Sequence, residues 1–209
     1  MIDLDTALSE CPLVAILRGI TAAECEAIGS ALIEEGLRII EVPLNSPDPY
    51  DSIRILANRF GDQALIGAGT VLSPAAVDEV AQAGGRLIVM PHSDPAVIAA
   101  SKKRGLACVP GVATPTEAFA ALAAGADALK LFPAEAISPA VVKALRAVLP
   151  ASVRLLPVGG IGAQNMAAYL AAGAAGFGIG STLYKPGKSA DQTQEDARKL
   201  MEAWRSALQ

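Results

Sequence analysis

The chain alternates between short apolar runs and longer alanine-rich segments along its whole length, and this repetition limits the folds open to it more than any other feature. Near-continuous apolar strands separated by helices are typical of a parallel sheet covered on both faces. Eight such units predict an α/β protein with a single (β/α)₈ TIM barrel spanning residues 1–209, and an open doubly wound sheet is the alternative. The eight runs lie at residues 13–19, 38–45, 64–71, 86–91, 106–112, 128–133, 153–160 and 176–181.

Helix-start signals between the runs support the alternation. A Thr-x-x-Glu pattern predicts a capping box, and a proline after Ser or Asp suits the first position of a helix. We also expect a short helix in the first dozen residues, below the barrel, and a final helix over residues 190–207. The capping boxes are expected at Thr21–Glu24 and Thr114–Glu117, and the proline starts at Ser73-Pro74, Asp94-Pro95 and Ser138-Pro139.

Composition excludes several classes of function. The net charge of −4 and the pI near 5.1 predict no broad basic surface, so nucleic acid and anionic membranes are poor partners. With His92 as the single histidine, one chain cannot build a metal site from several imidazoles, although carboxylate-held magnesium stays open. Three cysteines without C-x-x-C spacing argue against a disulfide framework. We expect no metal and no cofactor.

Residues 155–184 contain no charged residue and are long enough to span a membrane. Glycines and Pro157 interrupt this stretch, which therefore indicates a strand, a short helix and a second strand. The acidic amino terminus lacks the basic and apolar regions of a signal peptide. We expect a cytoplasmic protein that does not cross a membrane.

Three charged residues interrupt the apolar runs near the ends where barrel active sites lie. Arg18 closes the first run, Glu41 lies in the second between Ile40 and Val42, and Lys130 lies in the sixth. A buried charge costs several kcal/mol unless it is paired or neutralised, so each residue alone would be read as part of a structural ion pair. Three at the same end of one barrel favour an active site.

Lys130 carries the sharpest chemical signal. Apolar neighbours and a nearby cation such as Arg18 would lower its pKa, and a neutral amine is a nucleophile toward carbonyl carbon. The resulting iminium accepts electrons from a breaking carbon–carbon bond, and Glu41 is placed to shuttle the protons. In the alternative interpretation, Lys130 only neutralises Glu41.

Glycines at the ends of the seventh and eighth runs predict a phosphate site. Gly159 and Gly160 end one run, and Gly180 with Ser181 ends the other. Such residues expose backbone amides to an anion at the position where many barrels hold phosphate, although tight packing also explains glycine clusters. Thr70, after Gly67-Ala-Gly69 at the end of the third run, either donates to a substrate carboxylate or caps the next turn. His92, Asn45 and Ser46 are weaker candidates at the same end.

Six segments resemble one known family over the whole chain: AILRG, IEVPLNSP, GAGTV, ALKLFPAE, PVGGI and GIGSTLY. The chain resembles the Schiff-base aldolases that cleave 2-keto-3-deoxy-6-phospho sugar acids. This resemblance implies that Lys130 forms the Schiff base and that Glu41 is the general acid/base. It also implies that Arg18 and Thr70 bind the carboxylate end of the substrate. The phosphate site then falls on Gly159, Gly160, Gly180 and Ser181.

Within that family, two activities act on substrates that are epimers at C4, the gluconate and the galactonate series. The enzymes of the gluconate series tend to have LRT after the glutamate and a threonine before the paired glycines. Here the corresponding residues are Leu44-Asn45-Ser46 and Val158, which resemble the galactonate type. The implied reaction is reversible cleavage of 2-dehydro-3-deoxy-6-phosphogalactonate to pyruvate and glyceraldehyde 3-phosphate, in a homotrimer. The gluconate epimer, a phosphate-binding isomerase or synthase, and a non-catalytic sugar-phosphate binder are the alternatives.

Overall fold

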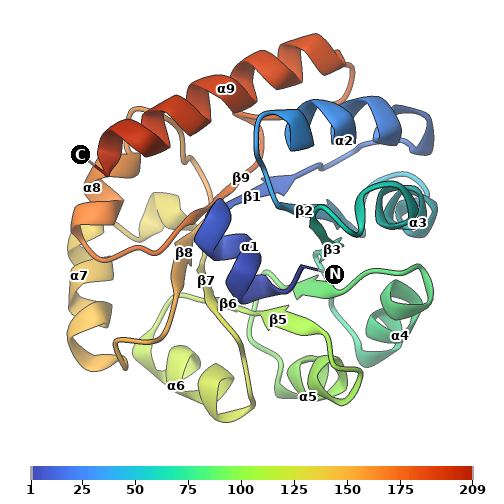
Figure 1. Cartoon of the computed structure of the whole chain (residues 1–209). Helices are drawn as coiled ribbons and strands as arrows, with labels where there is room; N and C mark the ends of the chain where they lie inside the picture. The colour runs from blue at the N-terminus through green and yellow to red at the C-terminus, as the bar shows by residue number, and fades with distance from the viewer. Residues whose placement is uncertain (1, 209) are drawn as a thin grey trace.

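The computed structural model describes residues 2–208, and each of the eight apolar runs contains at least one strand (Figure 1). The elements follow one another as α1 (Leu4–Glu10), β1 (Leu13–Ile16), α2 (Cys25–Glu34), β2 (Ile39–Pro43), α3 (Pro49–Phe60), β3 (Leu65–Gly69), α4 (Pro74–Gln82), β4 (Leu87–Val89), α5 (Pro95–Lys103), β5 (Ala107–Val109), β6 (Gly111–Val112), α6 (Pro115–Ala123), β7 (Leu129–Leu131), α7 (Pro139–Val148), β8 (Leu155–Pro157), α8 (Met166–Ala171), β9 (Phe177–Ile179) and α9 (Ala190–Ala207). Short 3-10 helices lie at Ala22–Glu24 and Ala134–Ala136.

The strands form two parallel sheets where one sheet of eight strands was expected. One sheet has the order β5-β4-β3-β2-β1-β9 and the other β6-β7-β8. The fifth run holds both β5 and β6, separated by Pro110. The carbonyl of Val109 accepts from Met90 N at 3.2 Å, whereas that of Pro110 accepts from Lys130 N at 2.9 Å. Adjacent carbonyls therefore bond to different sheets, so the chain passes from one sheet to the other here.

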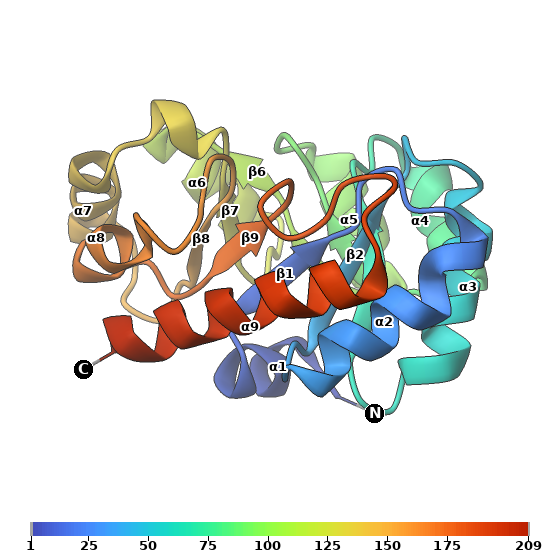
Figure 2. The ribbon, with the colours of Figure 1, turned by 90° about the horizontal axis from the view of Figure 1, so that it is seen from above.

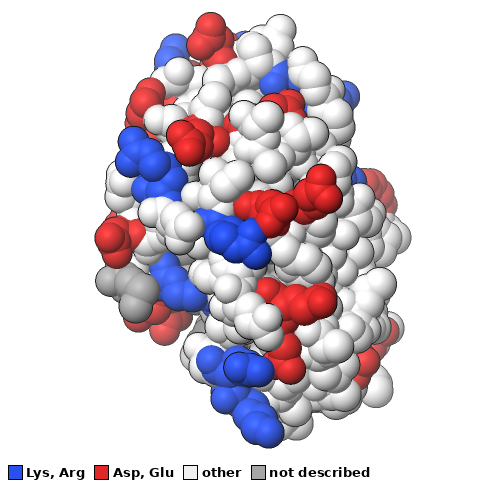
Figure 3. Space-filling model, turned by 90° about the vertical axis from the view of Figure 1, so that its right-hand side faces the viewer, with Lys and Arg blue, Asp and Glu red and all other residues white. Residues whose placement is uncertain are grey.

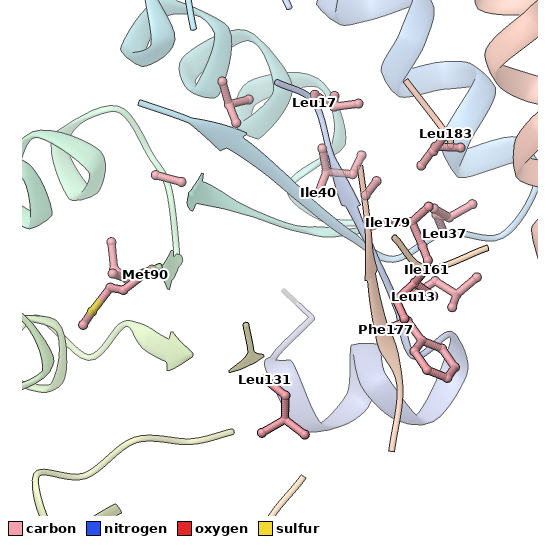
Figure 4. Close-up of a cluster of buried hydrophobic side chains, with 14 of the residues drawn as sticks. Leu13, Leu17, Leu37, Ile40, Met90, Leu131, Ile161, Phe177, Ile179 and Leu183 are labelled. Carbon is pink, nitrogen blue, oxygen red and sulfur yellow. The ribbon is translucent and has the colours of Figure 1, made fainter. Parts of the chain in front are cut away.

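Side chains alternate between two apolar clusters, because successive residues of a strand point to opposite faces. Leu13 and Ala15 belong to the outer cluster, between the strands and the helices, whereas Val14 belongs to the inner one. The same alternation puts Ile40 outside and Ile39 inside. Figure 4 shows part of the outer cluster, with Leu17, Leu183 and Phe177 among its labelled members. The strands are thus apolar on both faces, as their sequences predicted.

The expected amino-terminal helix is present as α1 and covers the inner cluster. Leu4, Ala7 and Leu8 pack into that cluster, and the Asp3 carboxylate caps the helix by accepting from Thr6 N at 2.8 Å. In Figure 1, α1 lies over the middle of the ring of elements, and Figure 2 shows it below the strands. One mouth of the interior is therefore closed by apolar side chains.

The predicted helix starts are confirmed at several positions. Thr114 and Glu117 form a capping box, in which Glu117 N donates to Thr114 Oγ1 at 3.3 Å and Thr114 N donates to Glu117 Oε2 at 2.9 Å. Proline occupies the start of α4, α5 and α7, and α9 begins at residue 190 as expected. These local signals decide where the helices begin.

Figure 3 shows Lys and Arg side chains interspersed with Asp and Glu on one face of the molecule. No broad basic patch gathers on that face, in keeping with the acidic composition. Within residues 2–208, the helices lack the combination of length and apolar composition that a membrane span requires. All three cysteines are free and buried.

Gly67 tests the close approach of two neighbouring strands. A Cβ on Gly67 would lie 2.1 Å from the backbone carbonyl oxygen of Leu87 on β4. Gly67→Ala should therefore lower the free energy of unfolding by about 1–3 kcal/mol, the usual cost of overpacking. Urea unfolding of Gly180→Ala is the control, since a Cβ there meets no atom within 4 Å. Equal midpoints for the two variants would contradict the close strand packing.

Candidate active site

Strand alternation brings Glu41 and Lys130 to the inner side of the sheets. Glu41 lies between Ile40 and Val42 of the outer cluster, and Lys130 lies between Leu129 and Leu131, which also point outward. Both side chains line one small cavity of about 20 Å³, together with apolar residues of the interior. Two residues almost ninety positions apart thus meet in one apolar environment.

The Glu41 side chain is 2% exposed, and its Oε2 has no hydrogen-bond partner within residues 2–208. The missing side chain of Gly69 makes room for it, because a Cβ there would lie 2.7 Å from Glu41 Oε1. Burial raises the pKa of Glu41, and the positive charges of Lys130 and Arg18 oppose that shift. The carboxyl group is therefore suited to hold and release a proton.

Lys130 is 6% exposed, and its ammonium nitrogen lies 4.7 Å from the centre of the Phe132 ring. Burial lowers its pKa; the negative charge of Glu41 opposes this shift, and Arg18 adds to it. Within residues 2–208, Lys130 and Glu41 do not form a salt bridge, because their charged atoms do not approach within 4.0 Å. The simple ion-pair interpretation therefore lacks its defining contact.

A second cavity, of about 400 Å³, adjoins the first. Arg18 lines it with all four residues of the predicted phosphate site, Gly159, Gly160, Gly180 and Ser181. Ile16, Val158 and Gly178 line both cavities and form the boundary between them. The structure thus brings five predicted site residues together beside the pair Glu41 and Lys130.

Thr70 follows β3 directly but lines neither cavity. Its φ of 56° lies in the left-handed region, which is strained for a β-branched residue. His92 is exposed and also lies outside both cavities. Thr70 therefore lies beside the site, next to Gly69, the residue that makes room for Glu41.

Two residues of the larger cavity were not predicted from the sequence. A Cβ on Gly159, where φ is +115°, would lie 2.2 Å from Glu135 Oε2, so the Glu135 carboxylate lies directly against the glycine pair. Lys185 lines the same cavity. Both follow the apolar runs instead of interrupting them, and only their position after a strand end could have indicated them.

Tyr184 forms part of the wall of this cavity and is 1% exposed. Its hydroxyl donates to Glu24 Oε1 at 3.3 Å, which joins the segment after β9 to the short helix after β1. Burial raises the pKa of Tyr184, so the hydroxyl stays protonated as a donor. Within the described residues, no group of three or more His, Cys, Asp or Glu is arranged to hold a metal ion.

The sequence and the fold match one known class of enzymes. The family model for KDPG and KHG aldolases matches residues 4–200, so the chain belongs to that family. Among its relatives, 2-dehydro-3-deoxy-6-phosphogalactonate aldolase of Escherichia coli K12 is 48% identical over 95% of this chain and 97% of that protein.

Solved structures agree with the sequence comparison. A structure described as native KDPGal has a TM-score of 0.94 and 47% identity, covering 95% of this chain and 97% of that one. KDPG aldolase of Legionella pneumophila, captured with pyruvate as a covalent carbinolamine, has a TM-score of 0.84 and 28% identity over 93% of this chain and 96% of that one. The family resemblance inferred from the sequence is therefore confirmed.

The burial of Glu41 predicts a pH-dependent cost in stability. Because its native pKa is raised, the wild-type free energy of unfolding should fall as pH rises from the ordinary value of 4.5 to the native value. Glu41→Gln lacks this titration, so its stability relative to wild type should increase across that range and then level off. Urea unfolding of both proteins between pH 4 and 8 measures the difference. A difference that is constant with pH would contradict the buried, titrating carboxyl group.

Proposed function

We propose that this chain is a class I, Schiff-base aldolase that reversibly cleaves 2-dehydro-3-deoxy-6-phosphogalactonate to pyruvate and D-glyceraldehyde 3-phosphate. The observation that carries the proposal is Lys130, a buried amine with a lowered pKa and no ion pair to Glu41. A lysine held in this state is a nucleophile, whereas a structural lysine is normally charged and paired. The names of the similar proteins, 2-dehydro-3-deoxy-6-phosphogalactonate aldolase and native KDPGal, independently support the choice of substrate.

The reaction follows from these two groups. The neutral amine of Lys130 adds to the C2 ketone, and loss of water leaves an iminium. Glu41 removes the proton of the C4 hydroxyl, directly or through a water molecule, and the C3–C4 bond breaks. The electron pair of the broken C3–C4 bond moves into the iminium and forms an enamine, while glyceraldehyde 3-phosphate leaves as the aldehyde. Protonation of the enamine at C3 and hydrolysis then release pyruvate and regenerate the amine.

The anionic ends of the substrate are assigned to the larger cavity and its surroundings. We assign the phosphate to the backbone amides of Gly159, Gly160 and Gly180 and to the hydroxyl of Ser181. Arg18 and Thr70 are assigned to the carboxylate end, and Arg18 also lines the cavity that contains the assigned phosphate site. The boundary between the cavities would then hold the carbons between C2 and the phosphate.

We infer that the two sheets close into one (β/α)₈ TIM barrel domain. At one junction, β5 and β6 are parts of a single run around Pro110. At the other, Val158 pairs with Gly178 in a parallel bridge, and Ala175 N donates to Leu155 O at 2.9 Å. These links support a continuous ring of strands around the inner cluster.

We also propose that the enzyme is a cytoplasmic homotrimer. Phe119 is 47% exposed and Val148 is 55% exposed, and large apolar side chains of this kind are suited to subunit contacts. The free, buried cysteines suit a reducing compartment.

Trapping of the Schiff base tests the reaction type. Borohydride reduction in the presence of pyruvate should add a reduced three-carbon unit to Lys130 and abolish activity, because reduction makes the iminium permanent. Peptide mass spectrometry locates the label. Lys130→Met should remain unlabelled, whereas Lys185→Met, which removes an exposed lysine of the adjacent cavity, should still be labelled. A label on another lysine, or none, would overturn the Schiff-base mechanism.

Val158 tests the choice between C4 epimers. It is 8% exposed and lies at the boundary between the cavities, where a substrate C4 hydroxyl would be placed. A valine there cannot form a hydrogen bond with the C4 hydroxyl of the gluconate epimer, so kcat/KM should be higher for the galactonate substrate. Val158→Thr, which has nearly the same shape, should shift the preference toward the gluconate epimer.

The two epimers are assayed with wild type, Val158→Thr and Val158→Ala, with pyruvate measured through lactate dehydrogenase. Val158→Ala is the control for lost packing, because it removes methyl groups without adding a hydroxyl. A wild-type preference for the gluconate epimer would contradict the specificity and leave the aldol cleavage intact.

A further inference from the structure

Arg18 is held by a neighbouring loop through two consecutive hydrogen bonds. Its Nη1 donates to Asn45 Oδ1 at 2.6 Å, and the next backbone amide, Gly19 N, donates to Ser46 Oγ at 2.9 Å. Asn45 itself is exposed, whereas Ser46 is 8% exposed. The segment after β2 therefore determines the direction of both the Arg18 side chain and the backbone that follows it.

The loop that holds Arg18 is itself anchored. Leu44 N donates to Gly69 O at 2.8 Å, and Ser46 N donates to Pro43 O at 2.9 Å. On the other side, a Cβ on Gly19 would lie 2.6 Å from Pro186 Cγ, so the backbone there is confined between Ser46 and Pro186. Asn45 is thus a fixed support for the guanidinium.

The chemistry of this support is distinctive because it is uncharged. Among residues 2–208, Arg18 forms no salt bridge within 4.0 Å. Its side chain donates instead to the amide oxygen of Asn45. A carboxylate in the same place would orient the guanidinium equally well but would neutralise its charge. An amide orients it and leaves the charge available to an anion.

We propose that Asn45 is a positioning residue, which holds Arg18 at the 400 Å³ cavity with its positive charge free for an anionic group of the substrate. The proposal rests on the proposed function, since it takes the ligand to be a sugar acid with two anionic groups, a carboxylate and a phosphate. Holding the guanidinium in place before binding reduces the rotamer freedom lost when the anion binds. Asn45 acts on the substrate only through Arg18.

Two substitutions separate orientation from charge. Asn45→Asp keeps the size and the acceptor oxygen but adds a negative charge beside Arg18, whereas Asn45→Ala removes the support. KM for 2-dehydro-3-deoxy-6-phosphogalactonate should rise about tenfold or more in Asn45→Asp and by a smaller factor in Asn45→Ala, with kcat nearly unchanged in both. A merely structural role predicts the reverse order, because aspartate preserves the hydrogen bond and alanine does not.

The Arg18→Met background supplies the matched control. If Asn45 acts through Arg18, the neutral variant Asn45→Ala should not raise KM further in that background. In the synthetic direction, separate KM values for pyruvate and glyceraldehyde 3-phosphate identify the end that Arg18 binds, and an increase in either supports the proposal. Thermal unfolding of each variant checks that the fold is retained.

The outcomes distinguish this inference from the proposed function. If wild type forms no Schiff base and cleaves neither epimer, the proposed function fails. If wild type cleaves the substrate but Asn45→Asp keeps the wild-type KM, or Asn45→Ala is the more damaging variant, the positioning role of Asn45 is overturned. A further KM increase for Asn45→Ala in the Arg18→Met background would overturn it as well.

Discussion

The burial of two ionisable side chains in one apolar interior is the constraint on which the rest of this structure depends. A charge removed from water costs several kcal/mol unless it is paired, and the recorded contacts of Glu41 and Lys130 do not include a mutual salt bridge. Burial instead moves both pKa values toward the neutral forms. The inner cluster and the covering helix α1 maintain this environment, and Leu4 of α1 lines the same small cavity as Glu41 and Lys130.

Glycines shape the space around this pair. The bare backbone of Gly69 receives the Glu41 carboxyl group, and that of Gly178 allows Val158 to approach within the boundary between the two cavities. The Lys130 amine and the Glu41 carboxyl group thereby lie in the apolar interior, whereas Arg18 and the paired glycines face a wider cavity. In the proposed mechanism, this division separates the amine that must be neutral from the groups that bind anions.

The sequence predicted much of the fold and singled out Glu41 and Lys130, because these signals are local. Apolar runs, capping boxes and prolines act within a few residues, and a lysine between Leu129 and Leu131 is anomalous without reference to any other segment. The division of the fifth run at Pro110 was not predicted, since it depends on which strands receive the adjacent carbonyl groups. The packing of Glu135 on the glycine pair was also missed, because it joins two loops.

By itself, the sequence determined the alternation of strands and helices and marked Glu41 and Lys130 as charged residues within apolar strands. It did not decide which face they occupy, because the strands are apolar on both faces. Only the tertiary structure decided which residues from separate loops meet. The hydrogen bond from Arg18 to Asn45 crosses 27 positions, and the contact between Gly159 and Glu135 joins the ends of two neighbouring strands. Such contacts depend on the spacing and twist of packed elements, which residue-by-residue patterns do not specify.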